Sequence, residues 1–147
     1  MSEATVPGGA TAPGRAALGT AGRAAPITLA DVRTAVDGEA LWFPDPAAPV
    51  AGVVVADLMS DVLVDASPGF VLVTGLATVQ AVRTAVIADL AAVVFTRGKA
   101  VPPEVVDLAK EMKVPVVTSP RSLFEAAGAL YAALGLEAAP LGRGRGA

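Results

Sequence analysis

The sequence contains no cysteine and no histidine, and aromatic residues make up only 4% of its 147 residues. These absences exclude a disulfide framework, a thiol enzyme, a zinc site of the usual kind and a histidine-based catalytic triad. Charged residues or prolines also interrupt each apolar stretch well before the roughly 18 residues that a membrane span needs. The Met-Ser-Glu start lacks the basic and apolar regions of a secretory signal. We therefore expect a cytoplasmic protein that does not associate with membranes.

What the chain has in abundance is small apolar residues, since 54% of its residues are hydrophobic and the mean hydropathy is +0.62. This is ample for the buried core of one domain. The net charge is −3, but the charged residues near the two ends sum to +3, so residues 27–137 carry −6. An acidic body argues against nucleic acid as a partner.

The composition divides the chain into three segments. Residues 1–26 are rich in Gly, Ala, Pro and Thr without periodicity, and from Ala138 onward the same composition returns. Such segments bury too little apolar surface to offset the entropy of ordering. We predict disordered tails at 1–26 and 138–147 around one α/β domain at 27–137.

Within that domain the apolar spacing and the capping residues predict an alternation of strands and helices. The first elements are a helix at 28–37 and short strands at 40–43 and 50–56. Residues 57–64 fit either a strand or a short helix, and we favour the helix. Three strand-helix units follow, with strands at 70–74, 91–96 and 114–118 and helices that begin at Thr78, Pro103 and Ser122. We predict a small, mostly parallel sheet with three consecutive C-terminal βα units, preceded by a helix and two short strands.

In open parallel sheets, ligands bind beyond the carboxyl ends of the strands, near helix N-termini that favour anions. Each of the three loops there begins with threonine, two carry cations, and two contain a glycine that lets backbone N–H groups approach a ligand. The candidate ligand-binding residues are Thr74, Gly75, Thr78, Thr96, Arg97, Gly98, Lys99, Thr118, Ser119 and Arg121. The same residues also have a structural explanation as helix caps, turn residues and solvated charges.

Two other patterns in the sequence resemble sites for metal or phosphate. Asp57, Asp61 and Asp65 would share one face of a helix and could in principle hold Mg²⁺, but a solvated acidic face is the better explanation of this spacing. Gly98-Lys99 resembles part of a phosphate-binding P-loop, but Ala100 follows the lysine and the first glycine of that motif is missing. The sequence thus predicts no catalytic residue, no metal and no cofactor other than a nucleotide ligand.

Five segments together resemble the DRTGG domain family. They read DLMSDV at 57–62, SPG at 67–69, DLAAVVFTRG at 89–98, PEVVDLAK at 103–110 and VPVVTSP at 114–120. The chain has Leu76-Ala77 where the family has Asp-Arg, and Thr96-Arg97-Gly98 in place of Thr-Gly-Gly. Such domains are accessory modules of larger enzymes, beside CBS domains in inorganic pyrophosphatases for example, and they are similar to the non-catalytic N-terminal domain of HPr kinase/phosphorylase.

This resemblance implies a regulatory module rather than an enzyme. Such a module would bind a small anionic ligand, a nucleotide or a phosphometabolite, and would act as a homodimer or on a partner enzyme. One alternative is a structural protein that dimerises without a ligand through the helix at 122–134, with Ala126, Ala127, Leu130 and Tyr131 as its surface. A phosphotransferase is the other, and it would rest on carboxylates and threonine-led loops alone.

Overall fold

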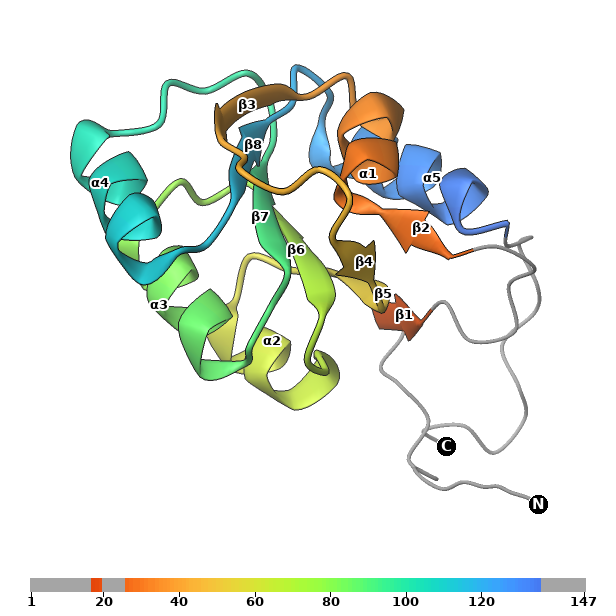
Figure 1. The fold of residues 1–147 in the computed structure, drawn as a ribbon, viewed down its shortest axis with the longest axis horizontal. Coiled ribbons are helices and arrows are strands. Elements are labelled where there is room, and N and C mark those ends of the chain that lie inside the picture. Colours follow the sequence, from red (N-terminus) through yellow and green to blue (C-terminus); the bar gives the residue numbers. More distant parts are fainter. Residues whose placement is uncertain (1–16, 20–25, 136–147) are drawn as a thin grey trace.

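The computed structural model describes residues 17–19 and 26–135 of the chain, which form a six-stranded sheet with helices on both faces (Figure 1). The strands are β1 (Ala17–Gly19), β2 (Ile27–Thr28), β3 (Glu39–Trp42), β4 (Pro49–Val50), β5 (Gly52–Val55), β6 (Phe70–Thr74), β7 (Ala92–Phe95) and β8 (Val116–Thr118). The helices are α1 (Leu29–Ala35), α2 (Met59–Asp65), α3 (Val79–Ile87), α4 (Pro103–Met112) and α5 (Leu123–Ala133). The predicted α/β class is confirmed.

The centre of the sheet is a run of four parallel strands in chain order, β5-β6-β7-β8. Each crossover moves one strand further in the same direction, and right-handed crossovers then place α2, α3 and α4 on one face. Helices α1 and α5 pack against each other and cover the opposite face (Figure 1). Strands β1 and β3 pair antiparallel at the two edges, and β2 and β4 form a separate two-stranded ladder.

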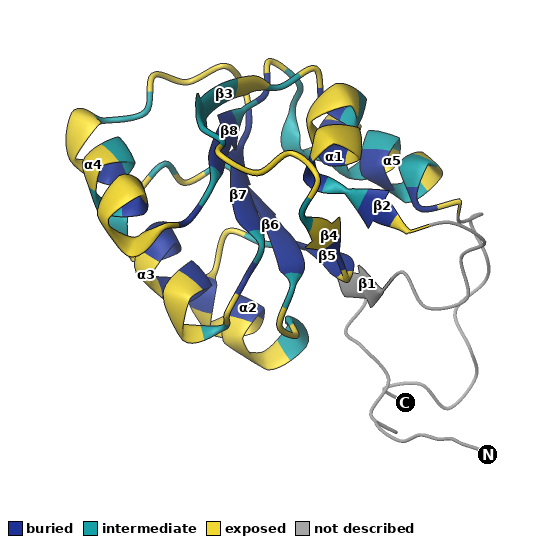
Figure 2. Ribbon diagram, in the orientation of Figure 1, coloured by how far each residue is buried: buried dark blue, intermediate teal, exposed yellow. Residues whose placement is uncertain are grey.

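The central strands are buried on both faces, as expected for parallel strands between two layers of helices. Every residue of β6 and β7 is buried, and these two strands form the dark centre of Figure 2. Successive side chains alternate between two apolar clusters. Leu72 and Val93 lie under α2, α3 and α4, whereas Val71 and Val94 lie under α1 and α5.

The three predicted βα units are present, and the structure adds a fourth. Strand β5 pairs in parallel with β6 and leads into α2, so β5 and α2 form a further unit of the same kind. Of the two predicted early strands, the one at 40–43 corresponds to β3, which ends the six-stranded sheet beside β8, whereas most of the one at 50–56 forms β5 inside that sheet. Residues 17–19 of the predicted N-terminal tail form β1 and Pro26 directly precedes β2, while the rest of both predicted tails lies outside the described residues.

The surface predicted on the last helix for dimerisation is partly wrong. Ala126 and Leu130 have exposed fractions of 0% and 1%, because this side of α5 packs on the sheet. Ala127 and Tyr131 are only half-buried. As for membranes, no helix in the described part of the chain combines the length and the apolar character that a transmembrane span requires.

Candidate functional site

The predicted site lies at the edge of the sheet where the four parallel strands end. Thr74 at the end of β6 is in register with Phe95 of β7, and Phe95 is in register with Thr118 of β8. The structure therefore brings the three threonines to neighbouring strand ends. Thr74 and Thr96 are fully buried, and the Thr96 N–H donates to the Thr74 carbonyl at 3.1 Å. Both side chains thus belong to the base of the site rather than to its surface.

Asp57, which the sequence predicts to begin a helix, lies in this row of loops instead. Asp57 follows β5, two residues before α2 begins, and its Oδ1 accepts hydrogen bonds from the Thr74 hydroxyl at 2.9 Å and the Gly75 N–H at 2.8 Å. The Thr74 hydroxyl in turn accepts from the Leu76 N–H at 3.2 Å. Asp57 thereby fastens the loop after β6, a role that was not predicted from the sequence, although its place directly after a predicted strand is a signal that could have indicated it.

This placement overturns the acidic face considered for Mg²⁺. Asp61 and Asp65 lie on α2, whereas Asp57 precedes the helix and is occupied by the neighbouring loop. Among the residues that the structure describes, no three carboxylates come close enough to hold a metal ion.

The loop after β7 is held by the loop after β8 through its backbone. The Arg97 N–H donates to the Arg121 carbonyl and the Gly98 N–H to the Ser119 carbonyl, both at 2.7 Å. Arg97 and Gly98 both have left-handed backbones, with φ of 71° and 60°. Since the N–H groups of Gly75, Arg97 and Gly98 already have partners, an anion at this edge would be recognised chiefly by side chains.

Three cations come from these two loops. Lys99 Nζ donates to the Gly75 carbonyl at 3.0 Å and so spans from the loop after β7 to the loop after β6. Arg121 forms an ion pair with Asp37 at 3.0 Å, with both side chains partly exposed. Arg97 is exposed, and its guanidinium has no hydrogen bond or ion pair within the described ranges. The edge therefore offers one unengaged cation and two that also fasten the loops.

Two of the predicted ligand-binding residues have structural partners. The buried Ser119 hydroxyl donates to the Val36 carbonyl at 2.6 Å and accepts from the Arg121 N–H at 3.1 Å. The Thr78 hydroxyl caps α3 by accepting from the Ala81 N–H at 3.2 Å. Their part in this edge is to fix the strand-to-helix connections.

The start of α5 adds a negative charge close to Arg121. Ser122 and Glu125 form a reciprocal capping box at this N-terminus. Hydrogen bonds from the Ser122 backbone and hydroxyl lower the pKa of the Glu125 carboxyl, and the nearby Arg121 guanidinium lowers it further. The carboxylate form of Glu125 is therefore the one that the folded helix favours.

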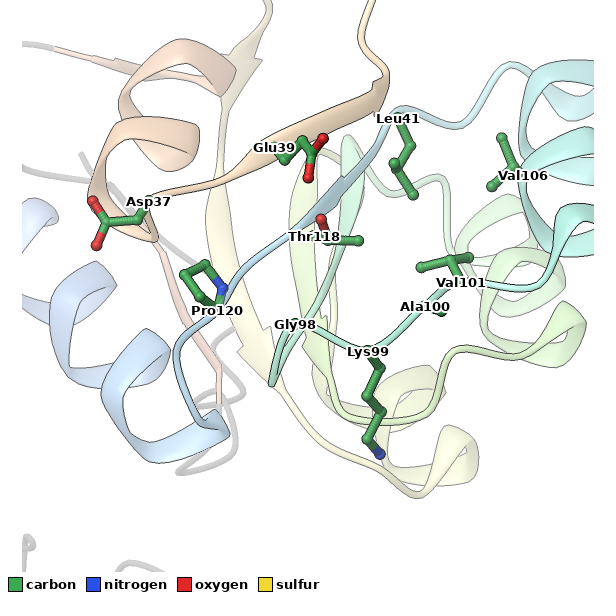
Figure 3. A pocket seen from close by; sticks show the side chains of 10 residues that line it. All are labelled: Asp37, Glu39, Leu41, Gly98, Lys99, Ala100, Val101, Val106, Thr118 and Pro120. Atoms are coloured by element: carbon green, nitrogen blue, oxygen red, sulfur yellow. The ribbon is translucent and has the colours of Figure 1, made fainter.

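A hollow of about 460 Å³ opens beside these loops, between β3 and the loop after β7 (Figure 3). The apolar side chains of Leu41, Val101 and Val106 gather toward α4, while Glu39 and Thr118 lie between them and Asp37. The remaining lining residues are Gly98, Lys99, Ala100 and Pro120. Of the predicted site residues, Gly98, Lys99 and Thr118 thus line this hollow. Glu39 and Leu41 were not predicted, because they come from an edge strand far from the loops in sequence.

Comparison with known proteins places this fold in a family. The model of the DRTGG domain matches residues 31–133, whereas no curated protein sequence matches the chain. A solved structure with a similar fold holds the CBS and DRTGG domains of the regulatory region of Clostridium perfringens pyrophosphatase, complexed with the activator diadenosine tetraphosphate. The TM-score is 0.62 at 20% sequence identity, over 72% of this chain.

The match covers 46% of that structure, so this chain spans less than half of its length. The family match, in contrast, covers the described domain from α1 to the end of α5. The resemblance seen in the five sequence segments is thereby confirmed, and the chain belongs to the DRTGG domain family.

Proposed function

We propose that this protein is a non-catalytic regulatory module that binds a small anionic ligand, a nucleotide or a phosphometabolite, at the carboxyl edge of its sheet. The observation that carries the proposal is that Arg97, Lys99 and Arg121 come from two loops at this edge that are hydrogen-bonded to each other, with the Arg97 guanidinium unengaged. On a domain whose body is acidic, an unengaged arginine on the same two loops as two further cations favours an anionic partner.

The backbone at Arg97 supports a role for its side chain. An L-residue in the left-handed region costs about 1–2 kcal/mol, and glycine, which the family motif has here, avoids that cost. Arg97 adopts φ 71° and presents an unengaged guanidinium to solvent. Arginine at this position thus supplies a cation where glycine would be the more stable residue.

The pyrophosphatase comparison supports a nucleotide as the class of ligand, since that regulatory region is complexed with the activator diadenosine tetraphosphate. The chain also lacks the groups that most transferases and hydrolases use, since it has no histidine, cysteine or Walker A loop. On this proposal the protein acts on a partner enzyme or on a second copy of itself by changing its binding state, not by chemistry.

The proposal is tested by thermal denaturation of the full chain with ADP, diadenosine tetraphosphate and pyrophosphate. A ligand at 100 times its Kd stabilises the folded state by about 2.7 kcal/mol, which is roughly 10 °C in Tm for a domain of this size. Arg97→Ala and Arg121→Ala should each weaken binding about tenfold or more, since a hydrogen bond to a charged group contributes about 1.5–3 kcal/mol.

Arg83→Ala is the matched control, because Arg83 is an exposed cation on α3, away from the strand ends. It should leave every ligand shift unchanged. The proposal fails if none of the three probes raises Tm, or if Arg83→Ala reduces the shifts as much as Arg97→Ala does.

A further inference from the structure

We infer that the hollow between β3 and the loop after β7 binds the nucleoside part of the ligand, with the base on an apolar wall and the ribose hydroxyls on Glu39. This inference rests on the proposed function and goes further, because it separates nucleotides from other phosphate compounds and assigns each half of the ligand a place.

The apolar wall consists of Leu41, Val101 and Val106 (Figure 3). Leu41 and Val101 pack against the core cluster under α2, α3 and α4 and are half-buried, as is Val106. For Leu41 and Val101, one side of the side chain is thus held by the core while another side lines the hollow, and Val106 lines it from α4. A rigid apolar surface of this kind suits the flat face of a base, and the volume of about 460 Å³ lies within the usual range for small-molecule sites.

The polar groups of the hollow call for a ligand that donates hydrogen bonds. Glu39 on β3 is directly opposite Thr118 on β8 in the antiparallel register, and such pairs have Cβ atoms about 4.5–5.5 Å apart. Within the described part of the chain, neither the Glu39 carboxylate nor the Thr118 hydroxyl has a side-chain hydrogen bond. The negative charge of a carboxylate repels phosphate. Because its oxygens only accept hydrogen bonds, it matches the two neighbouring hydroxyls of a ribose, which can donate them.

The charges in the hollow then set the direction of the ligand. Of its two carboxylates, Asp37 is already paired with Arg121, which leaves Glu39 as the acceptor. The ammonium group of Lys99 points away from Glu39, toward the loop after β6, where it donates to the Gly75 carbonyl (Figure 3). A nucleotide with its ribose at Glu39 would extend its phosphates along the loop after β7, toward Lys99 and Arg97.

The test compares three probes by isothermal titration calorimetry on the full chain: ADP, 2′,3′-dideoxy-ADP and pyrophosphate. Wild-type protein should bind ADP about tenfold more tightly than the dideoxy compound, and pyrophosphate more weakly than ADP. Glu39→Gln should weaken ADP about tenfold, should change the affinity for dideoxy-ADP little, and should leave pyrophosphate unchanged or bound more tightly. Glu111→Gln, an equal change of charge at an exposed position of α4, is the matched control.

A second variant fills the hollow. Val106→Trp should abolish ADP binding and preserve pyrophosphate binding, and its unliganded melting curve reports whether the domain is still folded. The inference is overturned if Glu39→Gln affects ADP no more than Glu111→Gln does, or if ADP binds no more tightly than pyrophosphate. Pyrophosphate binding that depends on Arg97 would then still support the proposed function, whereas absence of binding by all three probes would overturn both.

Discussion

Removing the Asp57 carboxylate should loosen the carboxyl edge of the sheet. Its Oδ1 is the acceptor for the Thr74 hydroxyl and the Gly75 N–H, which lie 2.9 and 2.8 Å away. Hydrogen bonds to charged groups contribute about 1.5–3 kcal/mol each. Asp57 itself is exposed, so water replaces part of what the Gly75 N–H loses, whereas Thr74 is fully buried. We expect Asp57→Ala to lower the free energy of unfolding by roughly 2–3 kcal/mol.

Two further variants make this reasoning refutable. Asp57→Asn retains one acceptor oxygen, so it should cost about half as much. Asp107→Ala removes an exposed carboxylate from the middle of α4 and should change stability by less than about 0.5 kcal/mol. Urea unfolding with equal m-values provides the comparison. If Asp57→Ala costs no more than Asp107→Ala, or if the alanine and asparagine variants are equally destabilised, the hydrogen bonds do not fasten this edge.

The remaining predictions concern packing and capping. Gly38→Ala should destabilise the domain by about 1–3 kcal/mol, because the added Cβ would overlap the Val117 side chain. Gly128→Ala should stabilise the domain by about 0.5–1 kcal/mol, because a Cβ at this position of α5 meets only open space. Urea unfolding measures both changes. Ser122→Ala should cost about 1 kcal/mol and return the Glu125 pKa part of the way toward its ordinary value, because the hydrogen bond from the Ser122 N–H remains; NMR titration measures this pKa. Since folding lowers the pKa of Glu125, its contribution to stability is present above its unfolded-state pKa and is lost as the pH falls through its folded-state pKa. An unchanged Glu125 pKa in Ser122→Ala would contradict the contribution of the Ser122 hydroxyl.

The main features of the fold could be predicted because they are encoded locally. The uninterrupted apolar run of β6 indicates a strand covered on both faces, and Thr78 and Ser122 mark the helix starts that the structure shows. The fourth βα unit was not foreseen. Strand β5 has only four residues and follows directly on the β4 segment, so nothing local distinguishes an internal parallel strand from a hairpin partner.

The site could be located from the sequence only to its row of loops. Strand ends of a parallel sheet must share one edge, so the positions of Thr74, Thr96 and Thr118 follow from the fold. The residues that contact these loops from elsewhere in the chain could not be predicted in the same way. Ser119 donates to Val36, 83 residues away, and Glu39 faces the hollow because β3 returns to pair with β8. Pairings at such sequence separations depend on the whole topology.

The most direct test of a ligand site at this edge is an amide ¹H–¹⁵N NMR titration of the full chain with ADP. The account predicts that the largest shift changes fall on the loop after β7 and on β3 and β8, at Gly98, Lys99, Ala100, Thr118 and Glu39, with little change on α2 and α3. Changes centred on α2 or α3, or none at millimolar ADP, would contradict it.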